Sequence, residues 1–375
     1  MGPPAVARGI MKAMEVLKWV VIAAGLWLVS GTALSLSHHP HWYVRGWDFP
    51  RVLVAALALV CGAVYRAFFF DERPLEIGFL VALGATIAYQ VSRIVAFTPL
   101  ARRMVHPARG KPGDASFRIA ISNVLMENDR FDLWKSVMKK ADPDIMVALE
   151  VDEKWMSALA PLRQTHPHVV DSVQDNYYGM VVFSRLPLEN AEVRHLVEDD
   201  TPSIRATVKL RNGERVTFYA LHPKPPEPLR DQDSAPRDAE LVLVAKEIAA
   251  SGSTPTVVCG DLNDVAWSDT TRIFRHLSGL LDPRIGRGLL NTYHADNPLF
   301  RFPLDHVFHS NHFRLFRLQR LPKVGSDHFP VLIELNLEPD APAEQPAPAA
   351  DEADVRVAEE IVDRQVNQGE GEAHG

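Results

Sequence analysis

The chain has 375 residues, 47% hydrophobic and 23% charged, so it can hold more than one domain and a sizeable core. Its formal net charge of -7 excludes a protein that binds nucleic acid mainly through bulk attraction to phosphates, while leaving room for a local basic groove. Cys61 and Cys259 both lie in apolar runs, so we interpret them as buried hydrophobic residues and not as a disulfide.

Three long apolar runs occupy residues 1–100 and predict a membrane anchor of about three transmembrane helices. Residues 19–36 carry no charge, and this length spans a bilayer with slight help at the ends. The charged residues in 49–70 are Arg51 and Arg66. Both lie near the ends of the run, where arginine side chains can reach the interface. The third run extends from residue 75 to about residue 100.

Three other interpretations of this region are a cleaved signal peptide, a buried core hairpin, and two helices with an interfacial segment. Ala33-Leu34-Ser35 would serve as a cleavage site, but a removed leader would not account for the two apolar runs that follow. Arg93 lies inside the third run and favours the two-helix alternative. We expect three helices embedded in a lipid bilayer.

The charges beside the spans conflict about the side of the membrane on which the rest of the chain lies. Arg8, Lys12 and Lys18 favour a cytoplasmic N-terminus, and three spans would then place the remainder outside the cytoplasm. Basic residues after the third span favour the opposite orientation, and these are Arg102, Arg103, Arg109 and Lys111. We expect a multi-pass membrane protein whose soluble domain is favoured on the extracytoplasmic side.

The remainder divides into a linker, a folded domain and a tail. Residues 101–116 are polar and contain two prolines and two glycines, which predicts a linker. Residues 117–337 have the pattern of a folded domain. Residues 338–375 are rich in Ala, Pro, Glu and Asp and predict a disordered acidic tail, with a short helix at residues 355–366 as an alternative.

Short apolar strands mixed with a few helices predict an α/β sandwich of two sheets for the folded domain. We expect strands at residues 117–123, 145–149, 179–184, 204–210, 216–221, 256–259, 304–308 and 330–335. We expect helices at residues 131–140, 238–250 and 270–277.

Polar residues recur where these strands end. They are Asn123, Glu150, His222, Asp261, Asn263, Asp305, Asp327 and His328. Since side chains at the strand ends of a layered sheet can converge on one rim, we expect them to form one site.

The residue types in this set indicate metal-assisted chemistry. Glu150, Asp261, Asn263 and Asp327 are hard oxygen donors without any accompanying Cys-His spacing for zinc, and such donors suit Mg²⁺ or Mn²⁺. His328 supplies a group that titrates near neutral pH, and Asp305 could orient it. His222 could hydrogen-bond a phosphate or act as an acid.

Each of these motifs alone also has a plainer interpretation. Residues 260–263 would pass for an Asp/Asn turn after a strand, and Asp327-His328 for a loop before the last strand. Ser326 raises the question of a serine hydrolase, but the sequence around it lacks a Gly-x-Ser-x-Gly elbow.

Taken in order, the motifs resemble the endonuclease/exonuclease/phosphatase superfamily, which includes the DNase I-like nucleases. The resemblance covers about residues 117–337. It is carried by Asn123, Asp142-Pro143-Asp144-Ile145 leading to Glu150, residues 178–185, Leu221-His222-Pro223, Gly260-Asp261-Leu262-Asn263, Leu304-Asp305-His306 and Ser326-Asp327-His328. It implies a four-layered α/β sandwich with the site at one edge.

By position, the resemblance also implies roles for these residues. Glu150 looks like the principal metal ligand, assisted by Asn123 and Asp327, and Asp261 and Asn263 look like the pair that positions water and phosphate. His328 resembles the catalytic histidine, oriented by Asp305, and His222 matches a second histidine of many members. Members differ over whether the histidine or the aspartate deprotonates water, so both stay open as the base.

Two departures from the family limit what the resemblance implies. Members often place the metal-binding glutamate after a glutamine, so the register around Glu150 is imperfect. No lysine- or arginine-rich insertion of the kind that grips duplex DNA is present. Arg230 and Arg237 follow a Pro-rich loop and are the expected substrate contacts, with a solvated surface loop as the plain alternative. The remaining histidines of the domain are expected to be structural or on the surface.

The sequence therefore predicts a membrane-anchored, Mg²⁺-dependent phosphohydrolase. Its substrate would be a phosphodiester or phosphomonoester in a lipid headgroup, a nucleotide or a nucleic acid. The alternative is a non-catalytic binding module that has kept the fold. The complete set of five site residues disfavours that alternative, since a binding module does not need Glu150, Asp261, Asn263, Asp305 and His328 together.

Overall fold

The computed structural model describes residues 5–37, 39–226 and 232–372. The chain divides into two compact units, Met1–Ala96 and Phe97–Gly375. Each unit is described by itself.

The N-terminal unit consists of α1 (Ala5–Leu34), α2 (Trp42–Arg45), η1 (Gly46–Asp48), α3 (Arg51–Phe68) and α4 (Pro74–Ile94). Three of these helices are long and apolar enough to cross a membrane, over residues 9–34, 51–68 and 74–97. They pack through a small apolar core that includes Leu28, Val54 and Leu83. Three candidate spans are therefore present, as the hydropathy of the sequence predicts.

Arg51 does not extend to an interface as expected from its place near the end of the second run. Its side chain is buried, pairs with Asp48, and donates to Gln90 Oε1 over 3.0 Å. Gln90 in turn donates to Thr32 Oγ1 over 2.8 Å. A buried guanidinium needs such partners, because an uncompensated charge among apolar helices is costly.

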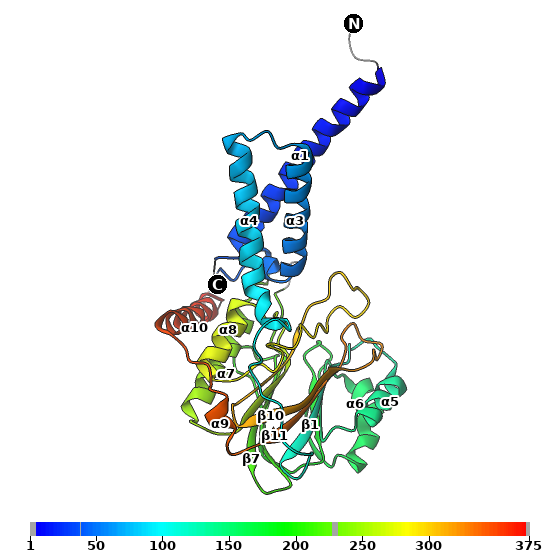
Figure 1. The fold of residues 1–375 in the computed structure, drawn as a ribbon. Helices are drawn as coiled ribbons and strands as arrows, with labels where there is room; N and C mark the ends of the chain where they lie inside the picture. The colour runs from blue at the N-terminus through cyan, green and yellow to red at the C-terminus, as the bar shows by residue number, and fades with distance from the viewer. Residues whose placement is uncertain (1–4, 38, 227–231, 373–375) are drawn as a thin grey trace. The chain divides into compact units, whose positions relative to one another are not determined.

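Two sheets form the centre of the C-terminal unit (Figure 1). The six-stranded sheet has the order β10-β11-β1-β2-β4-β3, and the five-stranded sheet has the order β5-β6-β7-β8-β9. The strands are β1 (Ser116–Asn123), β2 (Ile145–Leu149), β3 (His168–Ser172), β4 (Met180–Ser184), β5 (Leu188–Arg194), β6 (Ser203–Lys209), β7 (Arg215–Leu221), β8 (Thr256–Asp261), β9 (Asp305–His309), β10 (Phe313–Arg320) and β11 (Val331–Leu337).

Helices cover the outer face of each sheet, so the unit has four layers. The helices of the first sheet are α5 (Phe131–Ala141) and α6 (Glu153–Leu159), followed by η3 (Ala160–Gln164). The second sheet is covered by α7 (Ala235–Ala250) and α8 (Asp269–Ser278). The main core lies between the sheets and contains Ile119, Val147, Phe218 and Val257. The predicted four-layered α/β sandwich is confirmed.

Edge strands account for most of what the sequence pattern did not predict. β3 and β5 each form one end of a sheet, and most of their side chains are at least partly exposed. The polar sequence of β5 therefore lacks the apolar run that identifies a central strand such as β2, whose five residues are all buried. α6 is short and is capped by Asp152, whose side chain accepts the amide N–H of Trp155.

The expected linker is partly folded onto the domain. Val105 is fully buried, and the N–H of Ala108 donates to Leu315 O over 2.9 Å. Leu315 returns a hydrogen bond of 3.0 Å to His106 O, so this segment adds a short parallel bridge at the β10 edge. Covering an edge in this way satisfies backbone groups that would otherwise be free to pair with another chain.

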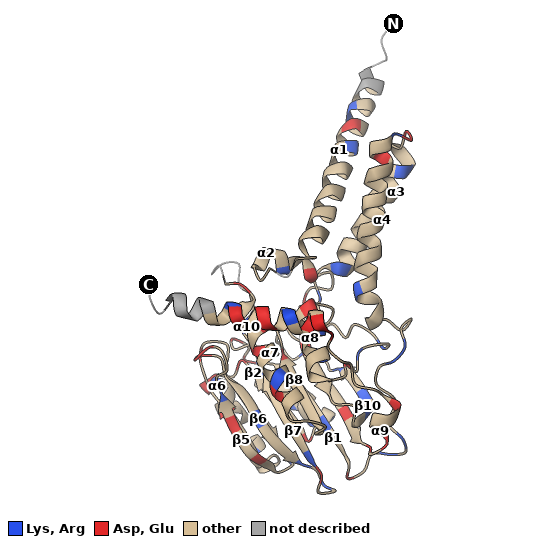
Figure 2. Ribbon diagram, turned by 90° about the vertical axis from the view of Figure 1, so that its left-hand side faces the viewer, with Lys and Arg blue, Asp and Glu red and all other residues tan. Residues whose placement is uncertain are grey.

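The prediction of a disordered tail is corrected by α9 (Ala341–Glu344) and α10 (Glu352–Glu372). Ala358 and Ile361, one helical turn apart on α10, pack on buried residues of α7 and α8. Asp354 anchors the start of α10 through Arg272 and His276, with contacts of 2.6 and 2.7 Å. Figure 2 shows that α10 carries many charged residues, so the composition of this segment does not indicate its narrow apolar stripe.

Candidate functional site

The site begins where β8 and β9 pair. Asp261, the last residue of β8, lies opposite Asp305, the first residue of β9. Gly260 precedes Asp261 with φ 148°, and a Cβ there would lie 1.9 Å from Leu221 O on the neighbouring strand. Only glycine fits this close approach of β7 to β8, and Asp261 follows it at the C-terminal end of β8.

His328 lies between the two aspartates. Its Nδ1 is 2.8 Å from Asp305 Oδ2, and its Nε2 is 3.5 Å from Asp261 Oδ2. The backbone N–H of His328 donates to Ser326 Oγ, and the ring of Tyr293 packs 4.9 Å from the imidazole. The imidazole is therefore fixed in orientation by one carboxylate and one aromatic ring.

The surroundings shift the pKa values of this group in a consistent direction. Burial alone would disfavour the imidazolium, but the charges of Asp305 and Asp261 outweigh it and raise the pKa of His328 to about 10. Burial also raises the pKa of Asp261, and the charge of His328 opposes this only in part. At neutral pH His328 is therefore a cation beside a carboxylate whose proton affinity is increased.

Glu150 and Asn123 come from the other sheet and meet Asp261. Asn123 Nδ2 lies 2.7 Å from Glu150 Oε1 and 3.2 Å from Asp261 Oδ2, so one amide bridges the two sheets. Glu150 has a left-handed backbone with φ 62°, an uncommon conformation for a residue of its type. Strain of this kind persists only where the surroundings impose it, and it tends to collect at functional sites.

The Glu150 carboxylate has the features of a cation ligand. Burial raises its pKa to about 7, although the Asn123 amide and the charge of His328 pull the value down. The N–H of Met126 donates to its second oxygen over 3.3 Å, but no Lys or Arg among the described residues forms an ion pair with it. A half-buried carboxylate whose described partners are all amides fits a divalent cation, which would supply the missing charge.

A second set of possible ligand atoms is formed by Asp261, Asp305 and His328, which lie within 4.8 Å of one another. His328 Nδ1 is hydrogen-bonded to Asp305 and its Nε2 faces Asp261, so His328 already supplies a counter-charge to this set, while Asp305 Oδ1 has no hydrogen-bond partner among the described residues. Hard oxygen donors that suit Mg²⁺ are therefore better supplied by Glu150, with Asn123 close by. Asp327 contributes to the same field, since its charge raises the pKa of Glu150.

His222 lies at the end of β7, with its Nε2 4.0 Å from Asp261 Oδ2. Burial lowers the pKa of His222 to about 4, so the ring is neutral at physiological pH. Tyr178 packs 5.6 Å from it. In the part of the chain that the structure describes, the buried Nδ1 has no hydrogen-bond partner.

The two expected substrate contacts have different outcomes. Arg230 lies outside the described residues. Arg237 is in α7 and directs its guanidinium to the chain itself, with Nη1 2.8 Å from Asn263 O and Nη2 2.7 Å from Asp238 Oδ1. Arg237, expected as a substrate contact, is buried and uses these donors to hold the loop beside the site, so the alternative of a solvated position does not describe it.

Three residues beside the site were not singled out from the sequence as functional. Tyr293 and Tyr178 pack against His328 and His222, and His306 hydrogen-bonds the loop after Asn263. Tyr178 belongs to the motif at residues 178–185. The position of His306 next to Asp305 on an alternating strand is a signal that it faces the opposite side of the sheet.

Comparison with known protein families gives a match over the part of the chain that contains these site residues. A family model described as the Endonuclease/Exonuclease/phosphatase family matches residues 121–328. A comparison with curated proteins finds no match.

Solved structures are similar to this chain at low sequence identity. Danio rerio TDP2 complexed with a single-strand DNA product is 16% identical, with 60% of this chain and 100% of that chain covered and a TM-score of 0.50. The human Nocturnin catalytic domain with a bound sulfate anion is 17% identical, with coverages of 60% and 96% and a TM-score of 0.48. An endonuclease/exonuclease/phosphatase from Beutenbergia cavernae is 17% identical, with coverages of 60% and 72% and a TM-score of 0.46.

Proposed function

Because the chain belongs to the Endonuclease/Exonuclease/phosphatase family, we propose that it hydrolyses a phosphate ester by metal-assisted attack of water at the edge formed by β1, β8 and β9. The observation that carries this proposal is the meeting of Asn123, Asp261 and His328 from three chain segments, with Asp305 2.8 Å from His328. A structural ion-pair cluster would not need an uncompensated Glu150 beside it.

The metal would be held by Glu150, assisted by Asn123 and Asp327. A bound Mg²⁺ or Mn²⁺ supplies neutralising charge to the phosphoryl and leaving oxygens. The raised pKa of Glu150 supports this assignment, because a nearby divalent cation would restore the charged form of the carboxylate. Asn123 keeps the carboxylate in place through its 2.7 Å hydrogen bond.

Between the two candidate bases, the surroundings favour Asp261. The carboxylates of Asp305 and Asp261 raise the pKa of His328 to about 10, which favours its protonated form at neutral pH and makes it the weaker candidate for accepting a proton from water. Asp261 has a raised pKa and would accept that proton as the water oxygen bonds to phosphorus and the ester oxygen leaves. His328, held by Asp305, would donate a hydrogen bond to a phosphoryl oxygen and stabilise its negative charge.

Asn263 and His222 would complete the surroundings of the phosphate. Asn263 is tied to Asp261 by a 3.0 Å hydrogen bond from its backbone N–H to Oδ1, so the two move together. His222, kept neutral by burial, can donate one hydrogen bond without adding charge. Both would orient the ester for in-line attack and neither would transfer the proton.

A membrane-proximal phosphodiester is the substrate class that we favour. The three candidate spans would hold the catalytic domain at a bilayer, with that domain on the extracytoplasmic side. The loop that carries Tyr293 also exposes Leu299 to 75% and Phe300 to 49%, and apolar side chains at a loop tip suit contact with a bilayer interface. Nucleotides and nucleic acid are the competing substrates, and a reporter fused to the C-terminus tests the orientation.

The proposal is tested with the full chain in lipid nanodiscs and Mg²⁺. Bis-p-nitrophenyl phosphate, plasmid DNA and phospholipid vesicles are the three substrates. We expect turnover of the diester, and loss of at least about 10³-fold in kcat for His328→Ala. His195→Ala, at an exposed histidine outside the site, is the matched control and should retain activity. Absence of turnover with every divalent metal would support a binding module instead.

A further inference from the structure

The loop after β8 places Asn263 in a left-handed conformation with φ 51°. Its side-chain Nδ2 donates to Pro223 O over 3.0 Å, and its backbone N–H donates to Asp261 Oδ1. Asparagine tolerates this conformation better than most residues, but the conformation is held in a single geometry only where neighbours fix the backbone on both sides. The two peptide carbonyls that follow are both fixed by side chains from other elements.

Arg237 holds the first of these carbonyls. Its Nη1 donates to Asn263 O over 2.8 Å, and its Nε and Nη2 both donate to Asp238 Oδ1 at 2.9 and 2.7 Å. Asp238 is itself fixed by Ser234 Oγ at 2.8 Å. Because the guanidinium is a planar fork of five donors, anchoring one side of it on Asp238 aims the other side at the loop.

His306 holds the second carbonyl. Its Nε2 lies 2.8 Å from Asp264 O, and its Nδ1 lies 2.7 Å from Arg284 Nη2. A guanidinium can only donate, so Nδ1 must be the acceptor and Nε2 must carry the hydrogen that binds Asp264 O. Burial, with the charge of Arg284 acting in the same direction, keeps the pKa of His306 well below its ordinary value and so preserves the neutral ring.

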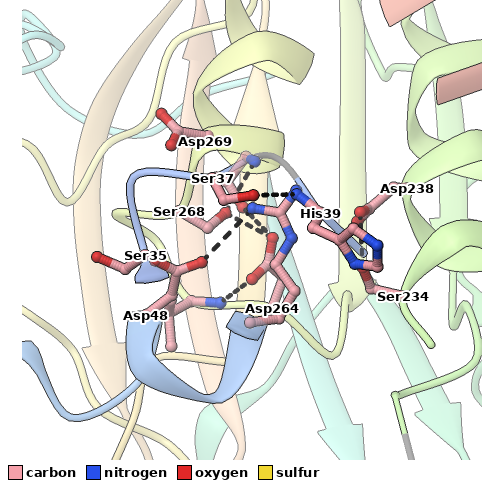
Figure 3. A network of polar contacts seen from close by, with 12 residues as sticks. Ser35, Ser37, His39, Asp48, Ser234, Asp238, Asp264, Ser268 and Asp269 are labelled. Carbon is pink, nitrogen blue, oxygen red and sulfur yellow. Dashed lines mark hydrogen bonds and ion pairs between the residues drawn. The ribbon is translucent and has the colours of Figure 1, made fainter. Parts of the chain in front are cut away.

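The side chain of Asp264 makes a third set of contacts that hold the loop, in addition to those of Arg237 and His306. Ser268 Oγ donates to Asp264 Oδ2 over 2.5 Å (Figure 3), and the N–H of Val265 donates to Oδ1 over 2.8 Å. Ser268 also caps α8 by accepting the N–H of Thr271. The loop is thereby tied to the start of a helix as well as to α7 and β9.

We propose that Arg237 and His306 are positioning residues for the hydrolytic reaction. They fix the carbonyls of Asn263 and Asp264 and so hold the side chains of Asp261 and Asn263 in their reactive geometry. The inference rests on the proposed function for its catalytic consequence. We call the group formed by Arg237, Asp264, Asp282, Arg284 and His306 the loop clamp. Asp282 belongs to it because its Oδ2 accepts a 2.7 Å hydrogen bond from Arg284 Nη2.

β9 explains why the loop clamp can act on the reaction without contacting substrate. Asp305 and His306 are consecutive on this strand, so their side chains point to opposite faces. Asp305 orients His328 on one face, while His306 orients the Asn263 loop on the other. A shift of about 1 Å in such a group can cost about 100-fold in rate, so the effect should appear in kcat and not in KM.

His306→Gln and His306→Leu form the matched pair that tests this role. A glutamine amide can replace the donor that binds Asp264 O, whereas leucine fills the space without any donor. With bis-p-nitrophenyl phosphate and the full chain in nanodiscs, we expect His306→Leu to lower kcat about 10- to 100-fold and change KM less than about threefold. His306→Gln should stay within about threefold of the unaltered chain. An equal decrease of kcat in both variants, or an increase of KM with unchanged kcat, would overturn the assignment.

Hydrogen–deuterium exchange supplies a readout that does not need activity. We expect faster exchange at residues 262–266 in His306→Leu and in Arg237→Gln/Asp238→Asn, with unchanged exchange in β1 and β2. The double substitution removes the charges of Arg237 and Asp238 together, but it also takes the Arg237 guanidinium away from Asp264 Oδ1, 3.7 Å distant, so His306→Leu is the cleaner of the two variants. Unchanged exchange at residues 262–266 in both variants would contradict the clamp even if no variant hydrolyses the diester. Failure of the unaltered chain to turn over, with the exchange result as expected, would count against the proposed function alone.

Discussion

Two buried polar clusters lie on either side of the Asn263 loop, and they treat charge in opposite ways. In the loop clamp, Asp282 receives Arg284 Nε at 2.9 Å and Nη2 at 2.7 Å. Although burial alone would raise the pKa of Asp282, Arg284 lowers it below its ordinary value. At the site, the donors that the described residues offer to the Glu150 carboxylate are both amides, and its pKa rises to about 7. A structural cluster carries its own counter-charge, and the site leaves one carboxylate for a cation from outside the chain.

The largest expected effect comes from removing the proposed base. Asp261→Asn should lower kcat about 10³- to 10⁴-fold because the amide cannot accept the proton of the attacking water. Stopped-flow or steady-state assays with bis-p-nitrophenyl phosphate measure the loss. Asp171→Asn, at an exposed position on β3, is the control and should keep the rate. If Asp261→Asn keeps its activity, Asp261 is not the base.

Breaking the compensated pair should affect stability more than chemistry. Arg284→Met leaves Asp282 buried without its partner and should lower the free energy of unfolding by about 3–5 kcal/mol. Urea denaturation of the full chain in detergent, followed by tryptophan fluorescence, gives this value. Arg284→Met/Asp282→Asn should recover part of the loss, since Asp282 is then uncharged. If the single and double variants are equally unstable, the pair is not the source of the effect.

The uncompensated carboxylate predicts a pH dependence of opposite sign to that of a salt-bridged acid. The folded-state pKa of Glu150 is about 7, above its ordinary value of 4.5, so the folded chain binds the additional proton between these values. In the absence of metal, stability should therefore fall by about 2 kcal/mol as pH rises from 4.5 to 7. Glu150→Gln should remove this slope from the stability profile measured in EDTA. An unchanged slope would show that another group causes it.

The smallest expected effect lies outside both clusters, on the C-terminal helix. Ile361→Ala should cost about 1–2 kcal/mol, because the residue is buried against α7 and α8 but docks at the margin of the domain. Val355→Ala on the same helix is a control, since that side chain is 40% exposed. Thermal unfolding in detergent measures the difference. Equal melting temperatures for the two variants would mean that α10 adds little to the stability of the domain.

The sequence predicts the central strands and the order of the site residues well for a common physical reason. Strands such as β2 are buried on both faces and read as continuous apolar runs, and site residues sit where those runs end. The sequence alone therefore predicts that Asn123, Glu150, Asp261 and Asp305 lie together where the strands end. The sequence does not predict that Asp261 lies directly opposite Asp305. That pairing depends on the register between β8 and β9, and so on the strand order of the second sheet.

The remaining features depend on contacts that no local pattern encodes. The inward direction of Arg237 requires the carbonyl of Asn263, twenty-six residues further along the chain. The folding of residues 338–366 depends on a narrow apolar stripe in an otherwise charged segment, and on Gln345 Nε2 donating to Phe313 O. The raised pKa of His328 likewise needs both aspartates in place, so its protonation could not be read from Asp327-His328 alone.

The dependence of turnover on Mg²⁺ concentration tests the central claim most directly. The unaltered chain, Glu150→Gln and Glu153→Gln are compared with bis-p-nitrophenyl phosphate as substrate. Glu153 lies three residues further along the chain and is exposed, so it is the matched control. We predict saturable activation by Mg²⁺ in the unaltered chain and in Glu153→Gln, and a loss of about 10³-fold in Glu150→Gln. Equal activation of all three chains, or turnover that persists in EDTA, would contradict a metal-assisted site at Glu150.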